Sequence, residues 1–116
     1  MIREFIELPK FLDKWKEAGL TEDDLIDLEV FLCEHPDAGD IIPGTGGLRK
    51  LRFSLKDKGK RGGARVIYVD FAFYERIYLF TAYTKSEKVD LTPDEKDKIR
   101  KSIKLLESEL ERKRIK

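Results

Sequence analysis

Residues 46–65 read GGLRKLRFSLKDKGKRGGAR, and this stretch decides the fold. Apolar and polar residues alternate over 48–55, which predicts a half-buried antiparallel strand. A long glycine-rich tip follows at 56–63, and a segment that is apolar on both faces begins at Ala64, as expected for a central strand. The stretch therefore predicts a β-hairpin inside a sheet, with an open basic face formed by Leu48, Lys50, Arg52 and Ser54.

Positive charge is concentrated in this hairpin. Residues 48–65 contain eight Lys and Arg against one acid, whereas residues 1–47 contain twelve acids against four Lys and Arg. The whole chain nevertheless has a net charge of only +1. A dipolar surface of this kind is typical of a protein that binds a polyanion, most often RNA or DNA.

Length and composition indicate a small cytoplasmic protein. A chain of 116 residues predicts one domain spanning 1–116. It contains no apolar run of about 18 residues and no signal-peptide layout, so we expect no membrane partner. Cys33 is alone and cannot form an internal disulfide. One Cys and one His are too few for a zinc shell without several carboxylates, so we expect no metal and no cofactor.

The segments before the hairpin predict a strand and two helices. A short strand is expected over 3–8, and a helix over 10–18 from the spacing of its apolar residues. Thr21 is a suitable N-cap for a second helix, which Pro36 ends. The turn-rich segment 37–47 contains Gly-x-Gly-Gly but lacks the Gly-Lys-Ser/Thr ending of a phosphate-binding loop, so we expect a connection there.

The segments after the hairpin predict two strands and a helix. Strands are expected over 64–71 and 76–83, joined by a turn at 72–75. Thr92 starts the last helix as N-cap, with a proline at its first position, and the helix is expected to last to about residue 112. The basic tail 112–116 is expected to fray. The order β-α-α-β-β-β-α predicts an α+β domain: an antiparallel, mostly meander sheet with an N-terminal helical hairpin and a C-terminal helix against one face.

Three segments together resemble a known family. They are GTGGLRKLR at 44–52, GKRGGARVIY at 59–68 and LFTAYTKSE at 79–87. Their combination resembles the RelE/HigB toxins of bacterial type II toxin–antitoxin systems, most closely the HigB-like branch, over roughly residues 20–110. The resemblance implies the small RelE-like α+β fold, which agrees with the predicted element order.

The resemblance also implies an activity and partners. Family members act on the 70S ribosome as metal-independent endoribonucleases that cut messenger RNA and inhibit translation. A ribose 2′-hydroxyl attacks the adjacent phosphate, leaving a cyclic phosphate and a free 5′-hydroxyl. A cognate antitoxin from the adjacent gene, commonly of the helix-turn-helix type, neutralises the toxin and connects it to operator DNA.

Candidate site residues follow from the same resemblance. It implies that Arg65, before an aliphatic-Tyr pair, stabilises the scissile phosphate, with Arg52, Lys85 and Tyr83 as further catalytic residues. For Tyr83, stacking on a base and core packing are equally open, whereas core packing is the better interpretation of Tyr68 and Tyr78. The remaining hairpin cations are candidates for contacts with RNA or the ribosome: Lys50, Lys56, Lys58, Lys60 and Arg61. Several family members carry a tyrosine or histidine near the C-terminus that assists proton transfer. Residues 88–91 of this chain read KVDL at that place, so the resemblance does not identify the general base.

Two other functions fit the same fold. ParE-like members share the architecture but inhibit DNA gyrase, usually with a less basic central hairpin. A catalytically silent module that binds RNA or a protein partner is the third interpretation, because a fold does not fix a function. Cleavage of a translated messenger distinguishes the first function from both others.

Overall fold

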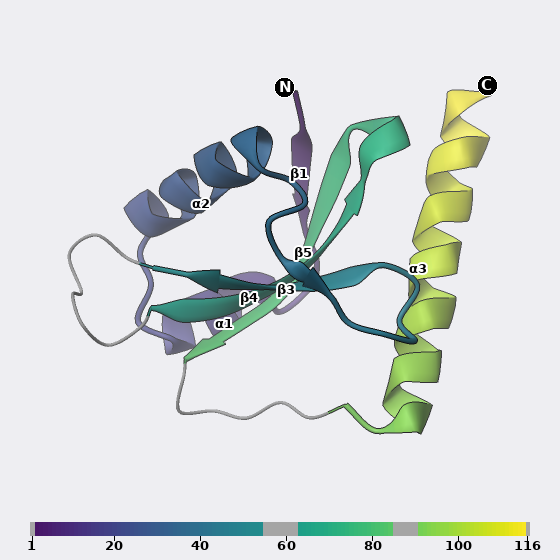
Figure 1. Cartoon of the computed structure of the whole chain (residues 1–116). Helices are drawn as coiled ribbons and strands as arrows, with labels where there is room; N and C mark the ends of the chain where they lie inside the picture. Colours follow the sequence, from purple (N-terminus) through teal and green to yellow (C-terminus); the bar gives the residue numbers. More distant parts are fainter. Residues whose placement is uncertain (1, 55–62, 85–90, 116) are drawn as a thin grey trace.

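The structure, a computed structural model, describes residues 2–54, 63–84 and 91–115. Within these ranges the elements follow the predicted order, with a two-residue strand and a 3-10 turn added (Figure 1). The helices are α1 (Phe11–Glu17), α2 (Glu22–Glu34) and α3 (Pro93–Arg114), and the 3-10 turn is η2 (Ala72–Tyr74). The strands are β1 (Glu4–Glu7), β2 (Asp40–Ile41), β3 (Leu48–Phe53), β4 (Ala64–Phe71) and β5 (Arg76–Thr84).

The described strands form one sheet in the order β1-β5-β4-β3-β2. Strands β3, β4 and β5 are antiparallel neighbours, so the predicted meander is present. The sheet is not purely a meander, because β1 pairs with β5 in parallel and β2 adds a short edge to β3. We had expected a turn-rich connection at 40–41. The two-residue edge could not be distinguished from a loop in the sequence because it is too short to show periodicity.

The helix ends follow their sequence signals. Thr21 and Thr92 each accept a hydrogen bond from the backbone N–H three residues later. Asp24 and Glu95 complete the two capping boxes by accepting from the N-cap backbone N–H. α3 continues to Arg114, two residues beyond the end expected near 112, and residues 112–114 are helical.

Two hydrophobic cores lie on opposite faces of the sheet. Leu28 and Leu32 of α2 pack with Val66 and Tyr68 of β4, together with Phe11 and Trp15 of α1. The alternate β4 residues Ile67 and Val69 pack instead with Ile103 and Leu110 of α3. The expectation that all helices cover one face is therefore wrong. It failed because β4 is apolar on both faces, and each face requires its own cover.

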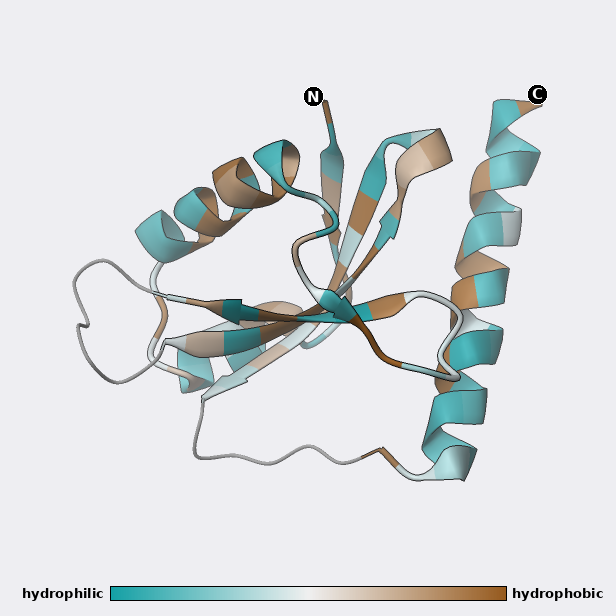
Figure 2. Cartoon of the chain, in the orientation of Figure 1, coloured by the Kyte–Doolittle hydropathy of each residue, from teal (hydrophilic) through white to brown (hydrophobic). Residues whose placement is uncertain are grey.

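Among the described elements, α3 lies along only part of its face of the sheet (Figure 1). α3 stands at one end of β3, near Leu48, whereas the Phe53 end of β3 and the Thr84 end of β5 extend away from it (Figure 1). Hydrophobic segments gather on the central strands, and hydrophobic and hydrophilic residues alternate along the helices (Figure 2). None of the described helices combines the length and the hydropathy needed to cross a membrane.

Candidate functional site: a basic row beside a pocket

Three of the predicted site residues lie side by side across the middle of the sheet. Arg52 of β3 is the register partner of Arg65 of β4, which is in turn the partner of Tyr83 of β5. Alternation from Ile67 and Val69 places Arg65 on the face of the sheet that packs against α3. The same rule places Arg52 and Lys50 on this face with Leu48. We call Lys50, Arg52, Arg65 and Tyr83 the basic row.

Tyr83 reaches this face because of a β-bulge. The pairing with β4 moves from Tyr68 with Leu79 to Ile67 with Thr81, so Phe80 has no register partner. Strict alternation from Leu79, which packs in the α1–α2 core, would have placed Tyr83 in that same core. The extra residue exchanges the two faces, and Tyr83 lies instead in the α3 core. Bulges often re-aim a side chain at a functional site, and this one adds an aromatic ring to the row.

The electrostatics of the row favour an anionic ligand. Arg52 and Arg65 are directly opposed across two neighbouring strands, and like charges in this arrangement repel each other. Arg52 and Lys50 are exposed, and neither forms an ion pair with an acid of the described ranges. Arg65 is partly buried. Two arginines on neighbouring strands suit a phosphate, since arginine pairs with phosphate oxygens in bidentate geometry.

A pocket of about 430 Å³ adjoins the row, between the sheet and the first turns of α3. Lys50 and Tyr83 belong to both the row and the pocket wall. The other described lining residues are Ile42, Leu48, Ile67, Phe80, Thr81, Leu91, Lys96 and Ile99. A mostly apolar wall with a few polar groups is typical of small-ligand sites.

The pocket wall is held in place by Thr45, the one fully buried polar residue among those described. Its Oγ1 donates to the Ile42 carbonyl at 2.6 Å and accepts from the Leu48 backbone N–H at 3.1 Å. The Ile42 N–H also donates to the Leu48 carbonyl at 2.8 Å. Two wall residues from the loop and from β3 are therefore fixed before any ligand arrives.

The Gly-x-Gly-Gly segment has a packing role. Gly44 and Gly46 have φ angles of 80° and 78°, which L-residues with side chains rarely adopt. A Cβ at Gly46 would lie 3.3 Å from Cγ of Arg100, and one at Gly44 would lie 3.7 Å from Cδ of Lys96. The glycines therefore let the loop lie against the side chains of α3, as a connection and not as a phosphate loop.

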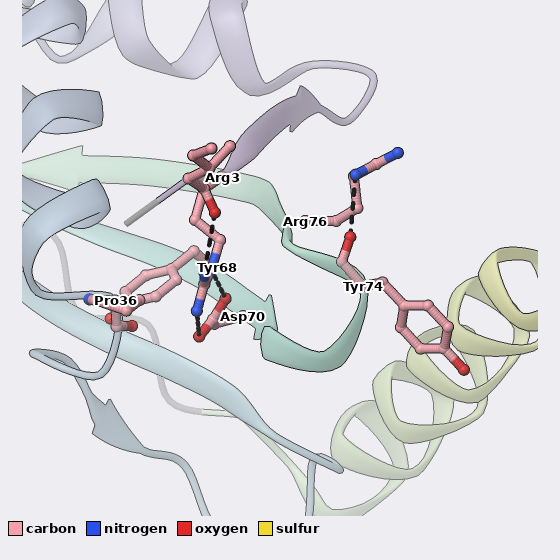
Figure 3. A network of polar contacts seen from close by, with 7 residues as sticks. Arg3, Pro36, Tyr68, Asp70, Tyr74 and Arg76 are labelled. Carbon is pink, nitrogen blue, oxygen red and sulfur yellow. Dashed lines mark hydrogen bonds and ion pairs between the residues drawn. The ribbon is translucent and has the colours of Figure 1, made fainter. Parts of the chain in front are cut away.

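Tyr68 is a core residue, as interpreted from the sequence. Its hydroxyl donates to the Pro36 carbonyl at 2.9 Å (Figure 3). The same hydroxyl accepts from the Gly39 N–H at 2.9 Å. Burial raises the pKa of this phenol above its ordinary value. Tyr78 is also buried, in the α3 core. His35 is the C-cap residue of α2 and packs against the Phe31 ring.

Five predicted site residues fall outside the described ranges: Lys56, Lys58, Lys60, Arg61 and Lys85. The residues that sequence reasoning missed are the pocket residues of α3 and β5, chiefly Lys96, Thr81 and Phe80. A pocket wall drawn from separate elements has no local signal in a sequence. Within the described ranges, no three His, Cys, Asp or Glu side chains are grouped so that they could hold a metal ion.

Comparison with known proteins gives no matching family model. Among solved structures, a doubly substituted E. coli RelE toxin in the free state is similar at a TM-score of 0.52 and 16% identity, over 74% of this chain and 86% of that one. The intact E. coli RelBE toxin–antitoxin complex is similar at a TM-score of 0.51 and 18% identity, over 74% of this chain and 99% of that one. The isolated E. coli RelE toxin is similar at a TM-score of 0.51 and 15% identity, over 90% of this chain and 98% of that one. At these identities the similarity concerns the fold, and the chain has a RelE-like fold.

Proposed function

We infer that this protein is the toxin of a type II toxin–antitoxin system and that it cuts messenger RNA on the ribosome. The observation that carries this proposal is the row of Arg52, Arg65 and Tyr83 across three neighbouring strands, with Lys50 beside it. Two opposed arginines suit a phosphate, and an adjacent aromatic ring suits a base. The RelE-like fold supports the same function, although fold alone would not establish it.

The chemistry assigned to the row is transesterification. The ribose 2′-oxygen loses its proton and attacks the adjacent phosphorus, and the bond to the 5′-oxygen breaks as that oxygen gains a proton. Arg65 and Arg52 neutralise the additional negative charge of the transition state. In many enzymes such electrostatic stabilisation is the largest single contribution to the rate enhancement. The ribosome orients the messenger, so the protein supplies mainly charge and alignment. Lys85 stays a proposed catalytic residue.

The partners of the proposed toxin follow from this function. They are the 70S ribosome with its messenger, and a cognate antitoxin whose contacts with operator DNA bring the toxin there indirectly. The antitoxin proposal is supported by the structural match with the toxin–antitoxin complex. The reaction requires ribosomes, so the protein would act in the cytoplasm. The HigB-like branch remains our proposal within the family.

The decisive experiment is cleavage of a translated messenger by purified ribosomes, with the wild type and with Arg65→Ala. We expect Arg65→Ala to reduce the cleavage rate by at least about 10²-fold, because one transition-state charge partner is lost. Products of the wild type should carry a cyclic phosphate and a 5′-hydroxyl. Antitoxin affinity should stay within about tenfold, since the substitution is confined to the row.

The matched control is Arg112→Ala, which removes the same charge from an exposed position on α3 paired with Glu109. This variant should cleave at the wild-type rate. Equal cleavage by Arg65→Ala and the wild type would remove Arg65 from the site. Failure of the wild type to cleave, together with inhibition of supercoiling by DNA gyrase, would instead assign the ParE-like function.

A further inference from the structure

The pocket beside the basic row has a chemistry of its own, distinct from that of the arginines. Its wall is apolar except for Lys50, Thr81, Tyr83 and Lys96. Both charged groups are ammonium ions, which donate hydrogen bonds and accept none. No carboxylate is found among the described residues that line it. A ligand must therefore offer a flat or compact apolar body together with hydrogen-bond acceptors.

The pocket is also placed to receive part of a ligand held by the row. Lys50, Ile67 and Thr81 are register partners, two residues along the strands from Arg52 and Arg65. Two residues of a strand span about 7 Å. An anion on the arginines and a group in the pocket can therefore belong to one nucleotide.

The bulge at Phe80 shapes the pocket. Phe80 and Thr81 are consecutive residues, yet both line it, because Phe80 has no register partner on β4. One supplies an apolar ring and the other a hydroxyl. On the opposite wall, the stem of Lys96 lies against the loop at Gly44. The polar groups thus face the pocket from β3, β5 and α3.

We propose that this pocket binds a base of the RNA chain and prefers guanine or uracil over adenine and cytosine. The proposal rests on the proposed function and names a base preference for the same site. On the edge that carries these groups, guanine presents two acceptors, O6 and N7, and uracil presents O4, whereas adenine and cytosine each present an amino donor there. Lysine ammonium groups satisfy the acceptors of the first pair and cannot accept from the amino groups of the second, which leaves only the hydroxyls of Thr81 and Tyr83 to do so among the described polar groups of the wall.

The first test is direct binding of the four nucleoside 3′-monophosphates, followed by NMR of isotope-labelled methyl groups. Guanosine and uridine nucleotides should shift the methyl signals of Ile67 and Ile99 and bind up to about tenfold more tightly than the other two. Lys96→Met, which keeps most of the side-chain volume and removes the charge, should abolish this difference. Lys98→Met is the matched control: it lies two residues along the same helix, is exposed and is not part of the wall, so the preference should remain.

The second test maps cut sites on ribosome-bound messengers by sequencing. Wild type and Lys98→Met should show an excess of G or U at one position relative to the cut, and Lys96→Met should lose that excess. Equal binding of the four nucleotides, or shifts that spare Ile67 and Ile99, would overturn the proposal. If the wild type cuts no messenger, the proposed function fails. The binding experiment still shows whether the pocket prefers guanine and uracil.

Discussion

At the scale of single residues, the buried ion pair between Arg3 and Asp70 ties the N-terminus to the central strand. Arg3 Nε lies 2.8 Å from Asp70 Oδ1, and a second contact joins Nη2 to Oδ2 at 3.3 Å (Figure 3). Their side chains are only 6% and 10% exposed. The hydrogen bond that the Arg3 guanidinium donates to Asp70 raises the pKa of Arg3. Removing one partner of such a pair leaves an uncompensated buried charge.

We predict that Asp70→Asn lowers the free energy of unfolding by about 3 kcal/mol, because Arg3 would keep its charge without a partner. The matched control is Glu4→Gln, in the neighbouring pair of Glu4 with Arg76, whose side chains are 61% and 35% exposed. This change should cost less than about 1 kcal/mol, since water screens an exposed pair. Urea unfolding of the two variants checks the comparison, and equal losses would contradict it.

The site residues differ in how far the sequence reveals them. Lys50 and Arg52 could be assigned to one face because β3 alternates without interruption. Tyr83 could be named from the family resemblance but not placed, since its face depends on the bulge at Phe80. Lys96 could not be found at all. Its approach to the pocket depends on how α3 packs against Gly44, a contact between residues about fifty positions apart.

At the scale of elements, the turn between β4 and β5 is fastened to the end of α3. The Tyr74 hydroxyl donates to the Glu111 carboxylate, which also pairs with Arg114. The Arg114 guanidinium in turn lies 5.4 Å from the centre of the Phe73 ring. These hydrogen bonds, first from Arg114 and then from Tyr74, lower the pKa of Glu111 to about 2. This link accounts for a helix that continues beyond the last apolar position of its stripe.

The lowered pKa of Glu111 makes this link depend on pH. The folded value of about 2 lies below the ordinary value of 4.5, so the stabilisation is complete above pH 4.5 and is lost as the pH falls toward 2. We predict that Glu111→Gln destabilises the protein at pH 6 and that its difference from the wild type shrinks steadily over this window. Urea unfolding at several pH values measures the difference. Glu107→Gln, one turn earlier, is the control and should show no such trend; a difference for Glu111→Gln that is constant with pH would contradict the prediction.

The elements themselves were largely predictable. Strand β4 spans Ala64–Phe71, as predicted from a run that is apolar on both faces, and both capping boxes start helices at the expected residues. The parallel pairing of β1 with β5 was not predictable, because nothing local to 4–7 specifies a partner about seventy residues away. The two-sided cover was missed for a different reason: the apolar stripe of α3 shows that it packs, but not on which face.

At the scale of the whole molecule, charge is divided between the two faces of the sheet. The helices α1 and α2, which lie in the acid-rich segment 1–47, cover one face, and the basic row lies on the other. An RNA strand approaching the row is therefore separated by the sheet from helix α2, which contains acids but no Lys or Arg. This division favours binding of a polyanion in one orientation.

We predict that binding to ribosomes weakens steeply with salt, because phosphate contacts release counterions. Three contacts, from Lys50, Arg52 and Arg65, would give a slope of log K against log salt of about −2. Arg52→Gln should make this slope shallower by about 0.7, as expected for one contact with single-stranded RNA. Lys98→Gln should leave it unchanged. Binding measured between 50 and 300 mM salt tests the prediction, and a flat response would argue against phosphate contacts by the row.

The alternation along β4 has a consequence for how this chain can change in length. Successive residues from Ala64 to Phe71 serve opposite cores, with Arg65 among those that face α3. Inserting or deleting a single residue after Arg65 would slip the register, sending either this arginine or the following apolar residues to the wrong side. Homologues of this protein should therefore tolerate many replacements in the strand but hardly any change in its residue count.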